Sequence, residues 1–262
     1  MSSVLVTGGT GLLGRLVVAE LVAAGHVVRV LTRHPRDAPP SATPRTLTYA
    51  TGDLRTSATL RTALEGIDTV VHCASDPRHG REVDVDGTGR LAAAMRAEGA
   101  GHLIYVSIVG VDHIPLGYYR VKQQTERVVE RSGVGWTVQR ATQFHQLLDT
   151  LLTGACRSPI VPLPRGLRFQ PVDPADLAQH LTRRVTAGPA GRTPDFGGPQ
   201  VLTVEELARR WLSKHRRGRV IVPAPLPGKV GRALKAGANL CPDQTPAGTR
   251  TWQQYLDRPT TP

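Results

Sequence analysis

The stretch near the start of the chain reads Val4-Leu5-Val6-Thr7-Gly8-Gly9-Thr10-Gly11-Leu12-Leu13-Gly14, a short β-branched run that breaks into glycines and then begins an apolar helix. Gly8 permits a tight turn, Gly11 lets the backbone approach a pyrophosphate without a Cβ atom, and Gly14 lets the helix pack closely on the strand. The helix, expected from Leu12 to Ala24, directs its free N–H groups toward an anion. The stretch therefore predicts a strand, turn and helix that bind phosphate.

A glycine-rich turn that binds nothing is the alternative interpretation of this stretch. The flanking sequence argues against it, because a second strand follows the helix and the alternation of strand and helix continues. Such alternation predicts an α/β fold of the Rossmann type, a doubly wound parallel sheet with helices on both faces. The expected strands are Val4–Thr7, Val27–Thr32, Leu47–Ala50, Thr69–Cys73, Leu103–Ser107 and Trp136–Arg140, and the expected helices after the first are Thr59–Leu64, Asp86–Glu98 and Tyr118–Arg131.

The end of the second strand is where such a fold selects its dinucleotide. An acidic residue there would accept hydrogen bonds from the adenosine ribose, but the sequence has Arg33, with Arg36 close by. A guanidinium matches a 2′-phosphate in both charge and geometry. We therefore expect NADP(H) to be favoured over NAD(H); the alternative is that both arginines simply face solvent.

Two further segments are expected to border the cofactor. Gly52-Asp53-Leu54 follows the third strand, and Cys73-Ala74-Ser75 ends the fourth with small residues that let a flat cofactor lie against the backbone. His72 is interpreted as a buried core residue and not as a ligand or base. The predicted cofactor-binding residues are Gly8, Thr10, Gly11, Leu12, Leu13, Gly14, Arg33, Arg36, Asp53, Leu54, Cys73, Ala74, Ser75 and Lys122.

A candidate catalytic pair follows the fifth strand. Tyr118 and Lys122 are four residues apart on a predicted helix, so their side chains project from one face. An ammonium beside a phenol lowers the phenol pKa, and it can also hold the ribose of the nicotinamide half. The phenol can then pass a proton to or from a carbonyl oxygen. Tyr119, the next residue, is the competing aromatic side chain.

With these residues in place, the chain resembles the short-chain dehydrogenase/reductase superfamily, in its atypical, extended-type branch with NmrA-like NAD(P)H-binding proteins. The resemblance implies a Ser-Tyr-Lys site at Ser107, Tyr118 and Lys122. Two features depart from the family: Ser107 and Tyr118 are only 11 residues apart, and Asp84 stands where extended members commonly have Asn. The motifs that carry the resemblance are Thr7–Gly14, Gly52-Asp53, His72–Ser75, Asp86–Thr88, Tyr105–Gly110, Tyr118–Lys122, Arg140–Phe144, Phe169–Asp176 and Gly197–Glu205.

The resemblance also implies the domain organisation. Residues 1–153 are expected to form the NAD(P)-binding domain, completed by segments near 169–185 and 196–212. The remaining parts of 154–262 are expected to form a smaller, irregular substrate-binding lobe, because proline and glycine become dense there. Two helices are predicted within it, Pro174–Val185 and Thr203–Lys214, the second with a capping box of Thr203 and Glu206.

Composition limits the other classes of function. The chain of 262 residues has three widely spaced cysteines, Cys73, Cys156 and Cys241, which argue against a disulfide framework or a metal cluster, so no metal is assigned. The first strand begins too early to leave room for a signal peptide, and no apolar run approaches ~18 residues. We therefore expect a cytoplasmic protein without a membrane segment, either a monomer or a homodimer.

The charge is strongly basic and unevenly distributed. The formal net charge is +12, and the segment from residue 181 onward has 14 Lys and Arg against 5 Asp and Glu. Either this segment faces an anionic ligand or its charges are solvated. Nucleic-acid binding by the basic segment Arg209–Arg219 is disfavoured, because it lacks interleaved aromatic residues for base stacking.

These observations predict an NADPH-dependent oxidoreductase that transfers hydride to a carbonyl, enone or quinone of a small metabolite, with Tyr118 as the proton donor. The substrate class includes anionic and aromatic molecules. Two rival hypotheses stay open: a redox sensor that binds dinucleotide without turnover, and an epimerase or dehydratase that retains its nicotinamide.

Overall fold

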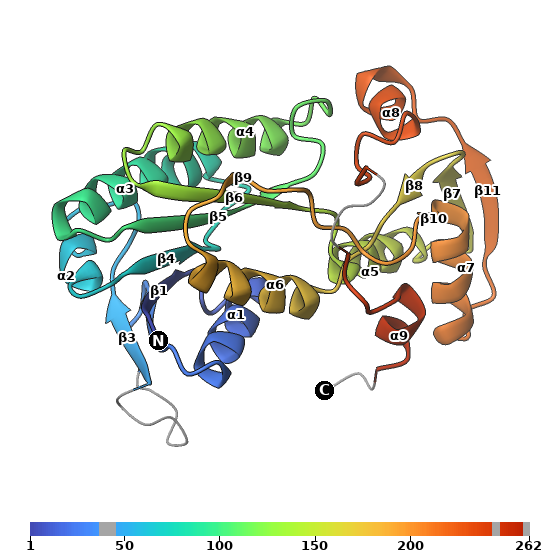
Figure 1. Ribbon diagram of the computed structural model, residues 1–262. Coiled ribbons are helices and arrows are strands. Elements are labelled where there is room, and N and C mark those ends of the chain that lie inside the picture. The colour runs from blue at the N-terminus through green and yellow to red at the C-terminus, as the bar shows by residue number, and fades with distance from the viewer. Residues whose placement is uncertain (37–45, 243–246, 259–262) are drawn as a thin grey trace. The chain divides into compact units, whose positions relative to one another are not determined.

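A seven-stranded sheet organises the chain in the computed structural model, which describes residues 1–36, 46–242 and 247–258. The strand order is β3-β2-β1-β4-β5-β6-β9, and β1 pairs in parallel with both β2 and β4 (Figure 1). This order confirms the predicted Rossmann-type α/β fold. The strands are β1 (Ser3–Thr7), β2 (Val27–Thr32), β3 (Leu47–Thr51), β4 (Thr69–His72), β5 (His102–Ile108), β6 (Gly135–Ala141) and β9 (Gly191–Arg192).

Helices cover both faces of this sheet (Figure 1). Helices α1 (Leu12–Ala23) and α6 (Pro174–Ala187) lie on one face, whereas α2 (Leu60–Leu64), α3 (Gly87–Glu98) and α4 (Gly117–Glu130) lie on the other. Successive strand residues point to opposite faces, so a strand buried on both sides must be apolar throughout. This explains β1, in which Val4, Leu5 and Val6 are all completely buried.

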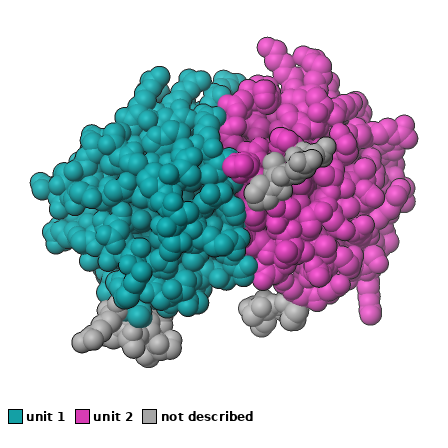
Figure 2. Space-filling view, in the orientation of Figure 1, with its two compact units in different colours: residues 1–107, 120–139, 177–193 teal, residues 108–119, 140–176, 194–262 magenta. Residues whose placement is uncertain are grey.

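The chain divides into two compact units (Figure 2). Unit 1 comprises residues 1–107, 120–139 and 177–193, and unit 2 comprises residues 108–119, 140–176 and 194–262. Residues 140–153, expected in the cofactor domain, thus group with unit 2. The assignment of cofactor and substrate binding to separate parts of the chain stays a prediction.

Unit 2 has its own apolar core, which contains the completely buried rings of Trp211 and Trp252. Strand β8 (Arg168–Phe169) pairs with β10 (Leu202–Thr203), and β7 (Ile160–Pro164) pairs with β11 (Val220–Ala224). The helices of this unit are α5 (His145–Ala155), α7 (Val204–Lys214), α8 (Gly228–Lys235) and α9 (Trp252–Leu256).

The second half of the chain contains more regular structure than the sequence predicted. The capping box of Thr203 and Glu206 is confirmed at the start of α7. Helix α5 was not predicted because it has no side-chain cap, and β7 and β11 were not predicted because both contain proline. Strands β8 and β10 have only two residues each, which is too short for a periodic pattern. A six-residue π-helical segment, Arg81–Asp86, also precedes α3.

The described residues contain no helix that combines the length and the apolar character needed to span a bilayer. They contain no group of three or more His, Cys, Asp or Glu side chains arranged to hold a metal ion. Cys73, Cys156 and Cys241 form no disulfide bond within these residues.

Candidate functional site

The glycine turn between β1 and α1 has a distinct geometry at each glycine. Gly8 adopts a φ of 66°, and a Cβ atom there would lie 2.6 Å from the backbone nitrogen of Ala74, so only glycine fits. A Cβ atom at Gly14 would collide with the carbonyl oxygen of Gly8. Gly11 is different, because it is exposed and a Cβ atom would meet only that carbonyl oxygen, at 3.3 Å. Two glycines therefore close the turn, and the third leaves its outer face open.

A cavity of about 320 Å³ lies over this turn, within unit 1. It brings together most of the predicted cofactor residues, namely Gly8, Thr10, Gly11, Arg33, Arg36, Asp53, Leu54, Cys73, Ala74 and Ser75. Four predicted residues are not in its wall. Leu12, Leu13 and Gly14 form the first turn of α1, and Lys122 is buried on α4.

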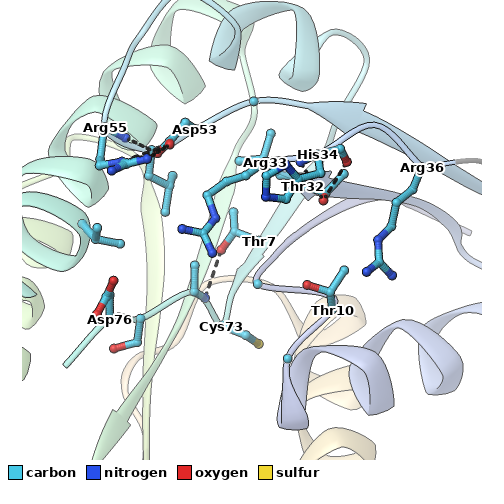
Figure 3. Close-up of a pocket in the computed structure, with 18 residues that line it drawn as sticks. Thr7, Thr10, Thr32, Arg33, His34, Arg36, Asp53, Arg55, Cys73 and Asp76 are labelled. Atoms are coloured by element: carbon cyan, nitrogen blue, oxygen red, sulfur yellow. Dashed lines mark hydrogen bonds and ion pairs between the residues drawn. The ribbon is translucent and has the colours of Figure 1, made fainter. Parts of the chain in front are cut away.

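Basic side chains from two loops line the cavity (Figure 3). Arg33 and Arg36 follow β2, whereas Arg55 follows β3 and was missed by sequence reasoning, which considered only the end of β2. Arg55 is paired with Asp53 at 2.6 Å, and hydrogen bonding from Arg55 lowers the pKa of that carboxyl. Arg33 and Arg36 make no ion pair within the described residues. Among the cationic side chains of this cavity, they are therefore the two best able to receive an anion.

A buried carboxylate connects the cavity wall to α4. Asp84 is fully buried, accepts a hydrogen bond from the Ser75 hydroxyl at 2.5 Å and another from the backbone N–H of Asp76 at 2.9 Å. The Lys122 ammonium lies 3.9 Å from its Oδ1 and donates to the carbonyl oxygen of Val106 at 2.9 Å. Burial lowers the pKa of Lys122 to about 8, although the Asp84 carboxylate opposes this change.

The sequence drew attention to Asp84 only as a departure from the family pattern. Its pairing with Lys122 could not be predicted, because the two residues are 38 positions apart and no local pattern links them. Through the Asp84 carboxylate, the amine of Lys122 is linked to Ser75, which lines the cavity.

His72 is a hydrogen-bonded core residue, as the sequence interpretation held. Its Nδ1 atom lies 2.6 Å from the Thr7 hydroxyl, and its Nε2 atom lies 2.8 Å from the Thr88 hydroxyl. Burial lowers its pKa to about 3, so the ring is neutral at physiological pH. Thr88 also donates to the carbonyl oxygen of Asp84. These contacts form one buried polar network beneath the glycine turn.

The remaining catalytic candidates lie near the start of α4 and the end of β5. Ser107 is 3% exposed, and its hydroxyl has no hydrogen-bond partner among the described residues. Tyr118 and Tyr119 are both half-buried in the first turn of α4. Burial raises the pKa of Tyr119, which contacts Gln143. Tyr118, and not Tyr119, has the four-residue spacing to Lys122.

Residues 8–150 match the NAD(P)H-binding family. The chain belongs to this family. The resemblance inferred from the sequence is confirmed, and the cofactor of this family member is NAD(P)H.

Two curated relatives and one solved structure illustrate the similarity. An uncharacterized protein of Mycobacterium tuberculosis is 28% identical over 210 residues, which are 78% of this chain but 22% of that protein. A (4-alkanoyl-5-oxo-2,5-dihydrofuran-3-yl)methyl phosphate reductase of Streptomyces griseus is 33% identical over 208 residues, which are 78% of this chain and 70% of the relative. The NADPH-dependent quinone oxidoreductase of Escherichia coli complexed with NADPH has the same fold, with a TM-score of 0.80 and 21% identity over 97% of this chain and 98% of that one. The chain spans about a fifth of the length of the first of these relatives.

Proposed function

We propose that this family member is an NADPH-dependent oxidoreductase that reduces a carbonyl, enone or quinone of a small metabolite. The observation that carries the proposal is the cavity of unit 1, in which an open glycine turn faces two arginines that make no ion pair within the described residues. Bound NADPH would supply the hydride. The residues described below would bind the nucleotide and move the proton.

The arginines support NADPH as the preferred nucleotide. A 2′-phosphate carries the charge that distinguishes NADPH from NADH, and a guanidinium can bind it with two parallel hydrogen bonds. Arg33 and Arg36 line the cavity, and the one carboxylate that follows β3, that of Asp53, is already engaged by Arg55. The residue directly after β2 is Arg33 and not the acidic residue that would accept hydrogen bonds from a ribose diol.

The fit of the nucleotide rests on the shape of the turn. A Cβ atom at Gly8 or Gly14 would meet backbone atoms, whereas one at Gly11 would project into mostly open space. The turn thus presents an unobstructed backbone surface, which a pyrophosphate could approach at the beginning of α1. Leu12, Leu13 and Gly14 would contribute through their backbone N–H groups, since Leu13 and Gly14 are buried.

Tyr118 is the proposed proton donor and Lys122 the residue that adjusts it. The two side chains share one face of α4, and a neighbouring ammonium favours the phenolate form. Asp84 and the Val106 carbonyl hold this ammonium in place. Ser107 is the proposed partner of the substrate oxygen, because a buried hydroxyl without a hydrogen-bond partner is costly unless a ligand satisfies it.

The relatives support the choice of electrophiles. The name of the Streptomyces griseus relative describes a ring double bond conjugated to carbonyl groups and a phosphate ester, and the Escherichia coli structure is of a quinone oxidoreductase. We therefore infer a conjugated carbonyl compound or a quinone as substrate, with phosphorylated compounds among the candidates.

A second candidate function is dinucleotide sensing without turnover. It is favoured by the burial of Lys122, which is 4% exposed and bound to protein groups at Asp84 and Val106. An epimerase or dehydratase that retains its nicotinamide is the third alternative.

The oxidation of added NADPH distinguishes these functions. Purified protein is incubated with NADPH and a panel of aldehydes, ketones, enones, phosphorylated enones and quinones, and the loss of absorbance of the reduced nicotinamide is followed. Net consumption with a panel member supports the oxidoreductase. Tight NADPH binding without consumption supports the sensor, and nicotinamide that co-purifies and is regenerated in each cycle supports the epimerase or dehydratase.

A further inference from the structure

A second hollow, lined by arginines, lies within unit 2 at the end of α7 and the beginning of β11. Its volume is about 580 Å³. None of its four guanidinium groups has an acidic side chain within ion-pair distance among the described residues. The lining residues are Arg209, Leu212, Ser213, Arg216, Arg217, Gly218, Arg219 and Ile221.

The backbone at this hollow places an arginine where glycine is usual. Helix α7 ends with a pair of hydrogen bonds, from the N–H of Arg216 to the carbonyl of Ser213 and from the N–H of Arg217 to the carbonyl of Leu212, each 3.1 Å long. This pattern is the Schellman motif, in which the residue in the left-handed conformation is normally Gly. Here it is Arg216, with a φ of 49°, the only non-glycine residue at positive φ in the described chain. The side chain is retained at a conformational cost.

Two of the four guanidinium groups are already held in position. The Nε atom of Arg219 donates to the carbonyl oxygen of Cys156 at 3.2 Å. The guanidinium of Arg217 lies 5.7 Å from the ring centroid of Trp211, which in turn stacks on His215 at 4.0 Å. Positioned cations lose less conformational entropy on binding than free ones do.

Stabilisation of the helix end does not explain the whole cluster. Cationic side chains near a helix C-terminus interact favourably with its partial negative charge. This accounts for Arg216 and Arg217, which flank the end of α7. It does not account for Arg209, in the middle of that helix, or for Arg219, which directly precedes β11, although both line the same hollow.

We propose that this arginine hollow binds a small organic molecule that carries two or more phosphate groups. Guanidinium groups match phosphate oxygens in charge and geometry, and four of them exceed what one phosphate can neutralise. Leu212 and Ile221 provide apolar surface for the organic part. The neighbouring aromatic ring, Trp211, is 1% exposed and cannot stack on nucleic-acid bases. A small phosphate ester therefore fits better than a nucleic acid.

The test uses the full chain and inorganic tripolyphosphate as the probe, measured by titration calorimetry. Arg216→Gly removes one guanidinium while giving the helix end its usual residue, so the midpoint of thermal unfolding is expected to stay the same or rise. Both Arg216→Gly and Arg217→Ala should weaken tripolyphosphate binding about tenfold, the loss of one charge-assisted contact. Arg210→Ala is the matched control, because Arg210 lies on the same helix but outside the hollow, and its affinity should equal that of the wild type.

A second control identifies binding at the cofactor cavity. With saturating NADPH present, so that the cofactor cavity is occupied, Arg216→Gly and Arg217→Ala should still weaken tripolyphosphate binding; binding that NADPH abolishes, or that is lost in Arg33→Ala and kept in Arg216→Gly and Arg217→Ala, would overturn the proposal. Two other probes are tested in parallel: duplex DNA, and vesicles that contain phosphatidic acid. Binding to either one that depends on Arg216 and Arg217, without binding of tripolyphosphate, would assign the hollow to a membrane or a nucleic acid and refute the small-molecule site.

Discussion

The substitution Asp84→Asn removes one buried charge from the polar network and keeps the shape of the side chain. In the wild type, the carboxylate of Asp84 lies 3.9 Å from the Lys122 ammonium and accepts a hydrogen bond from Ser75 at 2.5 Å. Both partners of the ion pair are almost completely buried. Removing one member of a buried pair leaves the other uncompensated, which destabilises the folded state.

The size of this destabilisation depends on pH, because Lys122 is no longer an uncompensated charge once it has lost its proton. Its pKa is about 8 in the folded protein. An opposite charge at such a distance raises the pKa of an amine by about 1 to 3 pH units, so loss of Asp84 should lower the value by about 2. Below pH 8 the wild type buries a paired ammonium, whereas above pH 8 Lys122 is neutral in both proteins. The loss in free energy of unfolding should therefore shrink by roughly 2 kcal/mol between pH 6 and pH 9.

Urea unfolding at pH 6, 7.5 and 9 measures this change. The comparison includes the wild type, Asp84→Asn, Lys122→Met and the double variant, because methionine keeps the apolar stem of lysine without its charge. The pH dependence of the Asp84 effect should disappear in the Lys122→Met background. An equal loss at pH 6 and pH 9, or a pH dependence that survives in that background, would refute the pairing as the source of the effect.

Three further predictions concern cofactor binding and catalysis. Tyr118→Phe should reduce turnover about 100-fold with little change in NADPH affinity, whereas Tyr119→Phe, turned about 100° around the helix, should leave both unchanged in steady-state assays. Arg33→Ala should remove a preference for NADPH over NADH of about 1 to 2 kcal/mol, measured by calorimetry with both nucleotides, and equal wild-type affinities would contradict this. Gly11→Val should abolish nucleotide binding, because a side chain would occupy the open face of the turn. The fold, checked by circular dichroism, should be retained because the backbone at Gly11 is extended, with a φ of −81°. Normal nucleotide binding by a folded variant would place the phosphate elsewhere.

The fold of unit 1 was predictable because its signals are local. The run from Val4 to Gly14 contains a strand, a turn and a helix start within a few residues of one another, and each imposes its own constraint on residue type. The same holds for the capping box at Thr203, in which two residues three positions apart satisfy each other's backbone. Local patterns of this kind survive without knowledge of the tertiary structure.

The structure of unit 2 was harder to predict because its strands violate the usual preferences. Pro162 and Pro164 lie in β7 and Pro223 lies in β11, although proline normally argues against a strand. Each strand pairs with a single neighbour, so a proline can direct its missing N–H toward the unpaired edge without loss of a sheet hydrogen bond. The pairing that makes these strands possible joins residues about 60 positions apart and leaves no periodic signal in the sequence.

The buried polar network joins the glycine turn to Lys122, a link that the separate sequence motifs do not reveal. Thr7 ends β1 at the glycine turn and contacts His72, which contacts Thr88, which donates to Asp84, the partner of Lys122. Substitution within this network is therefore expected to disturb both the floor of the cavity over the glycine turn and the position of the Lys122 ammonium. Loss of activity in such variants cannot separate nucleotide binding from proton transfer. Tyr118→Phe instead removes a single hydroxyl and keeps the ring, so it is the substitution proposed to test the chemical step separately from nucleotide binding.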